Sequence, residues 1–429
     1  MRLGGRLQGA IEILADIEAR KRPVADALKD WGLGHRFAGS GDRAAIGNIV
    51  YDALRMRLSH GYLMNDDSPA ALAHAVLFRQ WGVTPESLAA DTDGDRFAPE
   101  PLSESAVAAF AERTLSDADG YIQGDIPEWV QPSFADAFGD DWLAEAKALA
   151  ERPTLDLRAN ALKSSREKAA KALERAGAYP AKIARYGIRI AAGEGASRLP
   201  NVTAELSFQK GWFEVQDEGS QIVADLVMPQ EGDQVLDYCA GGGGKTLAMA
   251  AAMNNKGQVH AYDSDRKRLA PIIERLKRAG TRNVQVHDDR KSLTALIGRC
   301  DKVLVDAPCT GTGTWRRRPD TKWRLTQKNL EERIEQQQDA LTQAAEFVRP
   351  GGMLIYVTCS VLPQENQKQV EAFTAANPQF EIVESLSAWS SLFGDAAPRP
   401  RSQDGKTITL TPASTDTDGF FFCRMRRIA

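Results

Sequence analysis

Long apolar runs and paired cysteines are both missing from this chain of 429 residues. No stretch approaches the roughly 18 apolar residues that a membrane-spanning helix needs. Glu12 and Asp16 interrupt the apolar stretch near the N-terminus, so a signal peptide is not expected. The five cysteines are an odd number without a C-x-x-C pair, which argues against a disulfide framework and against a zinc site. These absences predict a cytoplasmic protein that binds neither membrane nor metal.

An excess of positive charge is also missing, because the formal net charge is −4. A surface that binds nucleic acid must therefore be local. The composition is that of a globular protein with enough apolar residues for real cores. The length suggests about three domains, and we expect the chain to act as a monomer.

The N-terminal part predicts a small helical domain, which we place at residues 1–125. Apolar residues recur at helical spacing from Leu7 to Ile17, from Ile46 to Ala53 and over residues 68–90.

Residues 126–204 predict a small basic α/β module. Between residues 151 and 190 there are ten Lys or Arg and four Asp or Glu, which is a local charge of +6. Alternating apolar residues at 155–157 and 188–190 predict strands, and residues 164–176 predict a helix. A basic face of this kind suits the phosphates of RNA, although an ordinary charged helix surface has the same composition.

Residues 205–429 alternate strand, turn and helix, which predicts a mixed or parallel sheet covered by helices. Asp237, Asp263 and Asp288 stand at or just after the ends of the first three expected strands. Open α/β sheets bind ligands at the carboxyl ends of their strands. The expected strands are 235–238, 259–262, 284–286, 303–305, 353–357, 380–383 and 419–425.

A glycine-rich turn, residues 239–245, follows the first of these strands and leads into a helix. Glycines let the backbone approach a ligand closely, and the helix N-terminus favours an anionic group. Cys239 stands where a P-loop requires glycine, and the spacing is not the G-x-G-x-x-G of a dinucleotide site. Acids ending the first three strands instead fit an adenosine-bearing cofactor such as S-adenosylmethionine.

Two further strands each lead into a cysteine. One runs into Asp306 and then Cys309, and the next ends in Cys359. Two thiols and one carboxylate at strand ends predict a catalytic site at this edge of the sheet. We expect the remaining cysteines to be small buried hydrophobes: Cys239, Cys300 and Cys423.

Five short motifs, in order along the chain, resemble those of the Sun (Fmu) type RNA cytosine-5 methyltransferase family. The resemblance covers about residues 205–429. The motifs are Gln216–Gln221, Asp237–Thr246, Asp306–Gly313, Thr358–Ser360 with Pro363–Asn366, and Asp418–Phe421.

The two preceding parts also resemble this family. The helical part, through the stretch Arg43–Leu58, is similar to the NusB-like RNA-binding domain of the bacterial small-subunit ribosomal RNA members. Leu157–Asn160 is similar to the RNA-binding extension before the catalytic domain. The fold implied is a Rossmann-like class I methyltransferase domain with a mixed seven-stranded sheet. A small α/β RNA-binding extension and an all-α NusB-like domain precede it.

The resemblance implies methyl transfer from S-adenosylmethionine to carbon 5 of a cytosine in RNA. It implies that Cys359 attacks carbon 6 of the base, that Cys309 assists release and that Asp306 contacts the base. Lys245 is expected to point towards the catalytic end. From the residues alone either cysteine could attack, because DNA cytosine methyltransferases use a cysteine after a proline, as at Cys309.

The same resemblance implies a cofactor site in which Asp263 holds the ribose and Asp288 lies near the adenine. The family usually has Ala-Pro where this chain has Gly241-Gly242, which loosens the loop and adds a backbone donor. We expect cofactor binding to survive this change. The implied cofactor-binding residues are Cys239, Ala240, Gly241, Gly242, Gly243, Gly244, Lys245, Asp263, Asp288 and Asp306.

A cation-rich segment follows Cys309. Residues 315–324 mix five cations with two indoles, a composition suited to a single-stranded RNA backbone and to base stacking. The target base must leave its stack for a thiol to reach it. The predicted RNA-binding residues are Arg316, Arg317, Arg318, Lys322, Arg324 and Arg158.

Ribosomal RNA of the small subunit is the favoured substrate, and transfer RNA is the alternative. A non-catalytic ribosome-assembly factor is a hypothesis from another class, which only the Gly241-Gly242 change favours. Two thiols at strand ends argue against it. A methyltransferase for proteins or small molecules would need neither those thiols nor the basic module.

Overall fold

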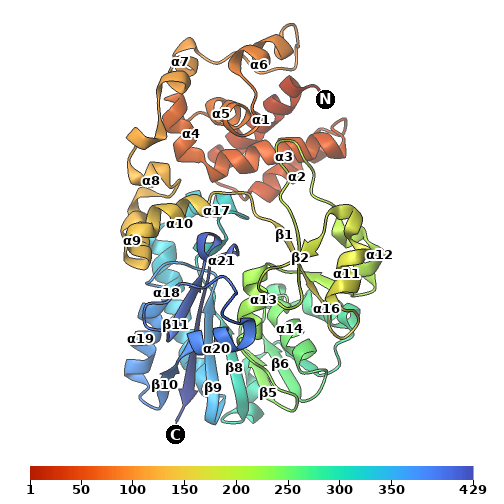
Figure 1. The fold of residues 1–429 in the computed structure, drawn as a ribbon, viewed down its shortest axis with the longest axis vertical. Coiled ribbons are helices and arrows are strands. Elements are labelled where there is room, and N and C mark those ends of the chain that lie inside the picture. The colour runs from red at the N-terminus through yellow and green to blue at the C-terminus, as the bar shows by residue number, and fades with distance from the viewer. Residues whose placement is uncertain (429) are drawn as a thin grey trace. The chain divides into compact units, whose positions relative to one another are not determined.

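The structure, a computed structural model, describes residues 1–428, which fold as two compact units (Figure 1). The first unit contains Met1–Pro153, Ala192–Leu199 and Trp315–Leu325. The second contains the rest of the described chain.

The first unit is helical. Its core is made by apolar residues of α1, α3 and α5, among them Leu7, Ile46 and Val76. The helical pattern predicted over residues 68–90 is divided into two helices, because Gly82 adopts a positive φ of 68° and the Thr84 hydroxyl caps the second one. The helices are α1 (Leu3–Arg20), α2 (Val24–Gly34), α3 (Ser40–Arg55), α4 (Arg57–Met64), α5 (Pro69–Gln80), α6 (Pro85–Thr92), α7 (Glu104–Glu112), α8 (Gly120–Gln123), α9 (Gln131–Phe138), α10 (Trp142–Ala148) and α17 (Pro319–Arg324).

The segment Trp315–Leu325, which includes α17, belongs to the helical unit although it follows Cys309 in sequence. Trp315 is fully buried and stacks on Phe134 with ring centroids 5.9 Å apart. The Lys322 ammonium donates to the carbonyl of Arg55 at 2.9 Å. The segment is therefore a packed part of the helical unit.

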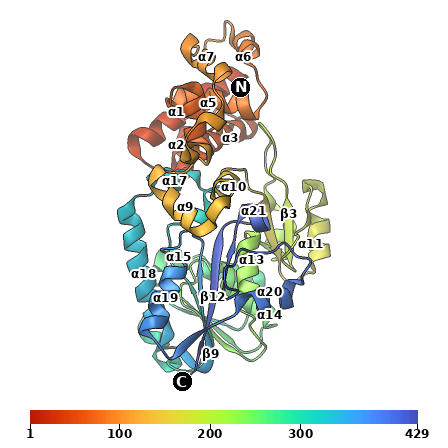
Figure 2. The ribbon, with the colours of Figure 1, turned by 60° about the vertical axis from the view of Figure 1, so that its left-hand side comes forward.

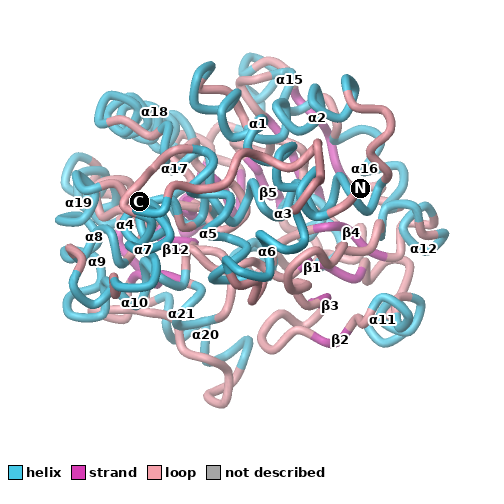
Figure 3. Tube along the Cα trace, turned by 90° about the horizontal axis from the view of Figure 1, so that it is seen from above, coloured by secondary structure: helices cyan, strands magenta, loops and turns pink. Residues whose placement is uncertain are grey.

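The second unit begins with a small antiparallel sheet in the order β2-β3-β1-β4. Figure 3 shows these strands with α11 and α12 beside them. The strands expected at 155–157 and 188–190 are β1 and β3. The elements are β1 (Leu155–Ala159), β2 (Tyr179–Pro180), β3 (Gly187–Ile190), β4 (Phe213–Val215), α11 (Arg166–Ala172) and α12 (Leu206–Gln209).

Part of the positive charge of this module lies inside the unit. Arg189 is 1% exposed, and its guanidinium lies 3.3 Å from Asp156, 2.8 Å from Glu218 and 2.8 Å from Asp416. The positive charge of this guanidinium is therefore compensated by carboxylates within the protein. The local charge of +6 is thus not all presented to a ligand.

The large sheet of the second unit confirms the predicted mixed sheet. Within residues 1–428 its strands follow the order β10-β12-β9-β8-β5-β6-β7, and β11, which the sequence did not predict, pairs with β12 as an eighth strand. The five strands from β7 to β9 are parallel, and β12 runs antiparallel to β9. The strands are β5 (Gln234–Asp237), β6 (Gln258–Tyr262), β7 (Val284–His287), β8 (Cys300–Asp306), β9 (Val348–Thr358), β10 (Phe380–Val383), β11 (Thr407–Leu410) and β12 (Phe420–Arg427).

Helices cover both faces of this sheet (Figure 2). Along β8, Val303 and Val305 pack in the core under α18 and α19, whereas Leu304 packs in the core under α13, α14 and α20. This alternation is the period of a strand that is buried on both faces. The helices are α13 (Glu218–Asp225), α14 (Gly244–Ala252), α15 (Arg266–Leu269), α16 (Ile272–Ala279), α18 (Gln327–Ala345), α19 (Gln367–Ala376), α20 (Ser385–Phe393) and α21 (Pro412–Thr415).

No helix within residues 1–428 is both long enough and apolar enough to cross a membrane. In the same described range, no cluster of His, Cys, Asp and Glu has the arrangement of a metal site.

Candidate active site

The candidate site lies at the carboxyl edge of the large sheet. Strands β6, β5, β8 and β9 are parallel neighbours, so their carboxyl ends meet at one edge. Asp237 and Asp306 are the last residues of β5 and β8, and Asp263 and Cys359 directly follow β6 and β9. The sheet brings together the groups that the sequence placed at separate strand ends.

The two predicted cysteines are in contact. The Sγ atoms of Cys309 and Cys359 lie 3.3 Å apart, and both residues are half-buried. The hydrogen bond with Cys359, together with burial, raises the pKa of Cys309 well above its ordinary value. At neutral pH Cys309 is therefore held as a thiol.

The loop that carries Cys309 is fixed by a buried carboxylate. Glu365 is fully buried and accepts hydrogen bonds from the Thr310 N–H at 2.8 Å and from the Gln337 amide at 2.9 Å. Gln337 also donates to the carbonyl of Pro308 at 3.0 Å. Both flanks of Cys309 are thus held in place.

Close backbone contacts also hold this loop. The Gly313 N–H donates to the Cys359 carbonyl at 3.0 Å, and the Gly419 N–H donates to the Gly313 carbonyl at 2.8 Å. A Cβ at position 313 would lie 2.3 Å from the Gly419 oxygen, so only glycine fits there.

Lys245 and Asp306 form an ion pair beside the cysteines. The Lys245 Nζ donates to Asp306 Oδ2 at 2.6 Å, and the Lys245 side chain is 8% exposed whereas that of Asp306 is 31% exposed. Burial alone would lower the pKa of Lys245. The charge of Asp306 and the hydrogen bond to it outweigh burial and raise that pKa, and a Cys359 thiolate would raise it further. The ammonium thus lies within electrostatic reach of both Asp306 and Cys359.

The glycine-rich turn is tied to the end of β6. The Gly241 N–H donates to Asp263 Oδ2 at 2.8 Å, and the Ala240 N–H donates to the Tyr262 carbonyl at 2.8 Å. Gly243 has a φ of 79°, and a Cβ there would lie 2.4 Å from the Ile272 side chain. This turn therefore requires a glycine at 243 for both conformation and space.

Two arginines brace the same turn from outside it. Arg275 on α16 donates to the Gly242 carbonyl at 2.5 Å and lies 3.1 Å from Glu214. Arg158 donates to Gln216 at 2.6 Å and to the Gly244 carbonyl at 3.4 Å. The glycine-rich turn lacks the proline that the family usually has at position 242, and the Arg275 and Arg158 side chains hold it instead.

Asp237 has one satisfied oxygen and one without a protein partner. It is 1% exposed, its Oδ2 accepts from the Thr246 hydroxyl at 2.7 Å, and its buried Oδ1 has no hydrogen-bond partner. Burial raises the pKa of Asp237 to about 7 against the effect of the Thr246 hydrogen bond. An orphaned buried acceptor beside a glycine turn fits a polar ligand at this place.

Two other members of the predicted cofactor set are Asp288, which is exposed, and Cys239, whose thiol is protonated. The Asp288 side chain is 69% exposed and lies 3.6 Å from Arg266. Burial raises the pKa of Cys239 well above its ordinary value, so this thiol stays protonated.

The predicted RNA-binding residues are divided by burial. Arg318 and Arg324 are exposed, and Arg317 is half-buried. Arg158 braces the glycine turn from a buried position. Arg316 and Lys322 are buried in the helical unit, so their charges are not presented on its surface.

Several residues of the site were missed by the sequence prediction. Thr246 and Glu365 lie inside quoted motifs but were given no role, and their position in those motifs was an available signal. Arg275 and Gln337 lie on helices α16 and α18 among other polar residues. Nothing in the sequence distinguishes them from solvated side chains.

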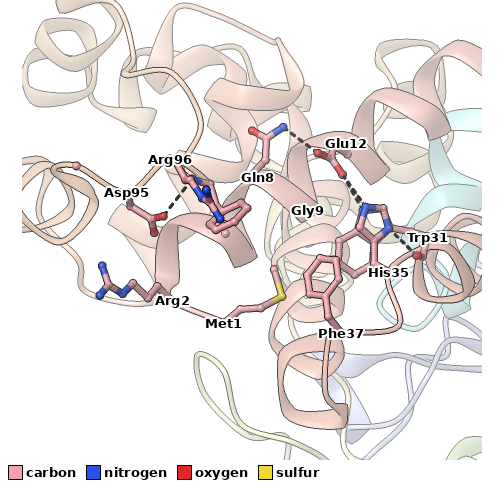
Figure 4. A pocket seen from close by; sticks show the side chains of 13 residues that line it. Met1, Arg2, Gln8, Gly9, Glu12, Trp31, His35, Phe37, Asp95 and Arg96 are labelled. Carbon is pink, nitrogen blue, oxygen red and sulfur yellow. Dashed lines mark hydrogen bonds and ion pairs between the residues drawn. The ribbon is translucent and has the colours of Figure 1, made fainter.

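The helical unit has a pocket of its own (Figure 4). It measures about 740 Å³, and Trp31 and His35 stack in its wall with ring centroids 4.1 Å apart. Glu12 accepts a hydrogen bond from the Trp31 indole at 2.8 Å, and Phe37 is 73% exposed. The lining also includes the carboxylates of Glu12 and Asp95, and the sequence prediction assigned this pocket no role.

Comparison with known proteins identifies the family of this chain. The family described as 16S rRNA methyltransferase RsmB/F matches residues 224–426. Ribosomal RNA small subunit methyltransferase B of Yersinia pseudotuberculosis is 32% identical over 318 residues, which cover 73% of this chain and 68% of that protein. The chain belongs to this family. The same-named protein of Cronobacter sakazakii is 34% identical over 309 residues, which cover 70% of this chain and 66% of that protein.

The family membership confirms the resemblance seen in the motifs, and the chain is a methyltransferase of the RsmB/F family. A ferredoxin-like domain of RsmF/B-like methyltransferases matches residues 126–194, which contain the small sheet strands β1 to β3. The helical N-terminal part is consistent with a NusB-like domain.

Solved structures confirm the fold. The structure of PH0851 has a TM-score of 0.74 at 23% identity, covering 99% of this chain and all of that one. The structure of NSun6 from Pyrococcus horikoshii with SFG has a TM-score of 0.61 at 23% identity, covering 71% of this chain and 98% of that one. Both support a Rossmann-like methyltransferase domain.

Proposed function

We propose that this protein transfers a methyl group from S-adenosylmethionine to carbon 5 of a cytosine in RNA, and that its substrate is small-subunit ribosomal RNA. The observation that carries the proposal is the pair of thiols 3.3 Å apart at the ends of adjacent parallel strands, beside the Lys245–Asp306 ion pair. Carbon 5 of cytosine is a poor nucleophile, and a thiol adding to carbon 6 activates it.

Cys359 is the nucleophile in this proposal. Its sulfur forms a bond to carbon 6, which moves electron density to carbon 5. The charge of Lys245 lies within electrostatic reach of Cys359, whereas the raised pKa of Cys309 keeps that residue protonated. After methylation, carbon 5 gives its proton to solvent, and the double bond between carbons 5 and 6 forms again. The carbon–sulfur bond breaks with its electron pair left on the Cys359 sulfur. Cys309, in contact with the leaving sulfur, assists this release.

Asp306 contacts the base. Its Oδ2 accepts a hydrogen bond from Lys245, and its side chain remains 31% exposed. A carboxyl group that hydrogen-bonds the ring nitrogen stabilises the charge that develops there on thiol addition.

S-Adenosylmethionine, when bound, supplies the electrophilic methyl group. The residues present fit this cofactor, because the buried Oδ1 of Asp237 lacks a partner and the glycine-rich turn follows the strand that Asp237 ends. Residues 239–245, Asp263 and Asp288 would hold it. NSun6 of Pyrococcus horikoshii was solved with SFG, an analogue of S-adenosylmethionine.

RNA contacts are assigned to the exposed members of the predicted set, Arg318 and Arg324, with Arg317. Their guanidinium groups suit phosphates. The ribosomal RNA methyltransferases that the chain resembles support the small-subunit substrate.

The adduct between protein and RNA tests the proposal. Cys309→Ala, Cys359→Ala and Cys300→Ala proteins are each mixed with S-adenosylmethionine and ribosomal RNA, denatured, and separated by electrophoresis. Cys300 is a matched control because it is buried at the opposite end of β8. We expect a denaturant-stable adduct with Cys309→Ala alone.

Three other outcomes contradict parts of the proposal. An adduct with Cys359→Ala would exchange the two roles. Methylation of transfer RNA but not of ribosomal RNA would change the substrate. Absence of both adduct and methyl transfer by the unmodified protein would favour an assembly factor that binds RNA without turnover.

A further inference from the structure

The contact between Cys309 and Cys359 has chemical consequences beyond methyl transfer. A disulfide has an S–S length of about 2.05 Å, so the two sulfurs, now 3.3 Å apart, need to approach by only ~1.2 Å. The other three cysteines differ in setting, because Cys300 and Cys423 are buried and Cys239 lies in the glycine turn.

The surrounding hydrogen bonds keep the two sulfurs in contact. The Cys309 loop is held by Glu365 through the Thr310 N–H, and the Gly313 N–H donates directly to the Cys359 carbonyl. A thiol kept beside another thiol has a high effective concentration, which favours an internal bond over reaction with a second molecule.

We propose that Cys309 and Cys359 form a reversible internal disulfide when the protein meets a hydroperoxide, and that this bond turns methyl transfer off. The loss of transfer rests on the proposed function, because a nucleophile bound to its neighbour has no thiolate to attack a base. Formation of the bond does not depend on that function.

The reaction balances with the hydroperoxide as oxidant. The Cys359 thiolate, beside the Lys245 ammonium, attacks the O–O bond of hydrogen peroxide, becomes a sulfenic acid and releases hydroxide, which takes a proton to become water. The Cys309 sulfur then attacks the Cys359 sulfur and the S–S bond forms. The sulfenic hydroxyl takes the Cys309 thiol proton and leaves as a second water. Two thiols lose two electrons in total, and the peroxide gains them. A dithiol reverses the step by exchange.

The neighbouring thiol also protects Cys359 from irreversible oxidation. A sulfenic acid without a nearby thiol proceeds to sulfinic acid under further peroxide, and that product is not recovered by a dithiol. Cys309 captures the sulfenic acid first, because its sulfur is already in contact with Cys359.

Intact-mass spectrometry of the full chain tests the bond directly. The unmodified protein is treated with a small molar excess of hydrogen peroxide, alkylated without reduction, and digested. We expect the loss of two hydrogens and a cross-linked pair of peptides that contain Cys309 and Cys359. The Cys300→Ala control is expected to form the same cross-link, whereas Cys309→Ser should instead gain two oxygens at Cys359.

Methyl transfer to RNA is measured on the same samples before and after peroxide, and again after dithiothreitol. We expect transfer to be lost with the cross-link and regained on reduction in the unmodified protein. In Cys309→Ser, peroxide modification of Cys359 should not be reversed.

A mass spectrum with Cys359 oxidised to sulfinic acid in the unmodified protein, or with a cross-link to another cysteine, would overturn the disulfide. A cross-linked protein that still transfers methyl groups would overturn the switch. If the untreated protein transfers no methyl group, the proposed function fails, while the peptide map still decides whether the bond forms.

Discussion

Lys245 Nζ lies 2.6 Å from Asp306 Oδ2, so a side chain from the first turn of α14 and one from the last residue of β8 form a single ion pair at the sheet edge. Breaking such a pair leaves the remaining group without its partner in a partly buried place. We expect Lys245→Met and Asp306→Asn each to lower the rate of methyl transfer by about 10²–10⁴-fold.

When two residues act as one unit, the effects of their substitutions on the reaction rate are not additive. The double variant is therefore expected to transfer no more slowly than the worse single variant, measured as kcat under saturating RNA. Lys267→Met on exposed α15 is the control and should keep the full rate. Multiplicative losses would mean that the two side chains act separately.

Glu365 is the residue on which the position of Cys309 depends. Glu365→Ala removes the acceptor of the Thr310 N–H and of one Gln337 amide N–H, while the Gln337 hydrogen bond to the Pro308 carbonyl remains. Each donor left without an acceptor costs about 1–3 kcal/mol. Under the proposed function we expect slower release from the base, and thus an RNA adduct that accumulates as it does in Cys309→Ala. Glu371→Ala, an exposed acid on α19, is the control. Unfolding by denaturant separates the stability loss from the adduct, and a destabilised variant with no adduct contradicts the positioning role.

Arg275 holds the cofactor turn through the Gly242 carbonyl. Arg275→Met loses this hydrogen bond and the ion pair with Glu214, so the free turn samples more conformations. We expect roughly tenfold weaker binding of S-adenosylmethionine, since one hydrogen bond to a charged group contributes about 1.5 kcal/mol or more. Calorimetric titration measures it, with Lys277→Met on the same helix as control. Adding Gly242→Pro to Arg275→Met should restore part of the affinity. Equal affinities of Arg275→Met and the unmodified protein would show that Arg275 does not hold the turn for cofactor binding.

Asp237 makes stability depend on pH. Its pKa is about 7 in the folded protein and 3.8 when exposed, so the folded state binds more protons between these values. Stability of the ligand-free protein should therefore fall as the pH rises from about 4 to 7, by at most about 4 kcal/mol for this group. Asp237→Asn keeps an acceptor for Thr246 without the charge. We expect its melting temperature to exceed that of the unmodified protein at pH 8 and the difference to vanish at pH 4. A difference that is constant with pH would show that ionisation of Asp237 is not the cause.

The local patterns predicted most of the large sheet because each depends on neighbouring residues. Apolar runs predicted strands β8 and β9, and shorter apolar-rich stretches predicted β5 and β6. The acids and cysteines at the strand ends followed from where these stretches stop. Strand β11 was not predicted, because Thr407–Leu410 is a short run that becomes a strand only by pairing with β12.

The charged residues show the limit of that reasoning. Composition alone cannot distinguish a cation that faces solvent from one that is enclosed by partners distant in sequence. Lys322 donates to Arg55 across 267 positions of the chain, and Arg189 is surrounded by acids from three separate segments.

The sequence by itself determined the sheet, the glycine turn, and the two thiols and carboxylate at strand ends, because these follow from local periodicity and from residues adjacent in the chain. Only the tertiary structure decided that the thiols touch, that Glu365 and Arg275 hold the loops around them, and which cations are buried. These are contacts between residues from about 30 to more than 260 positions apart, and packing, rather than any local preference, selects them.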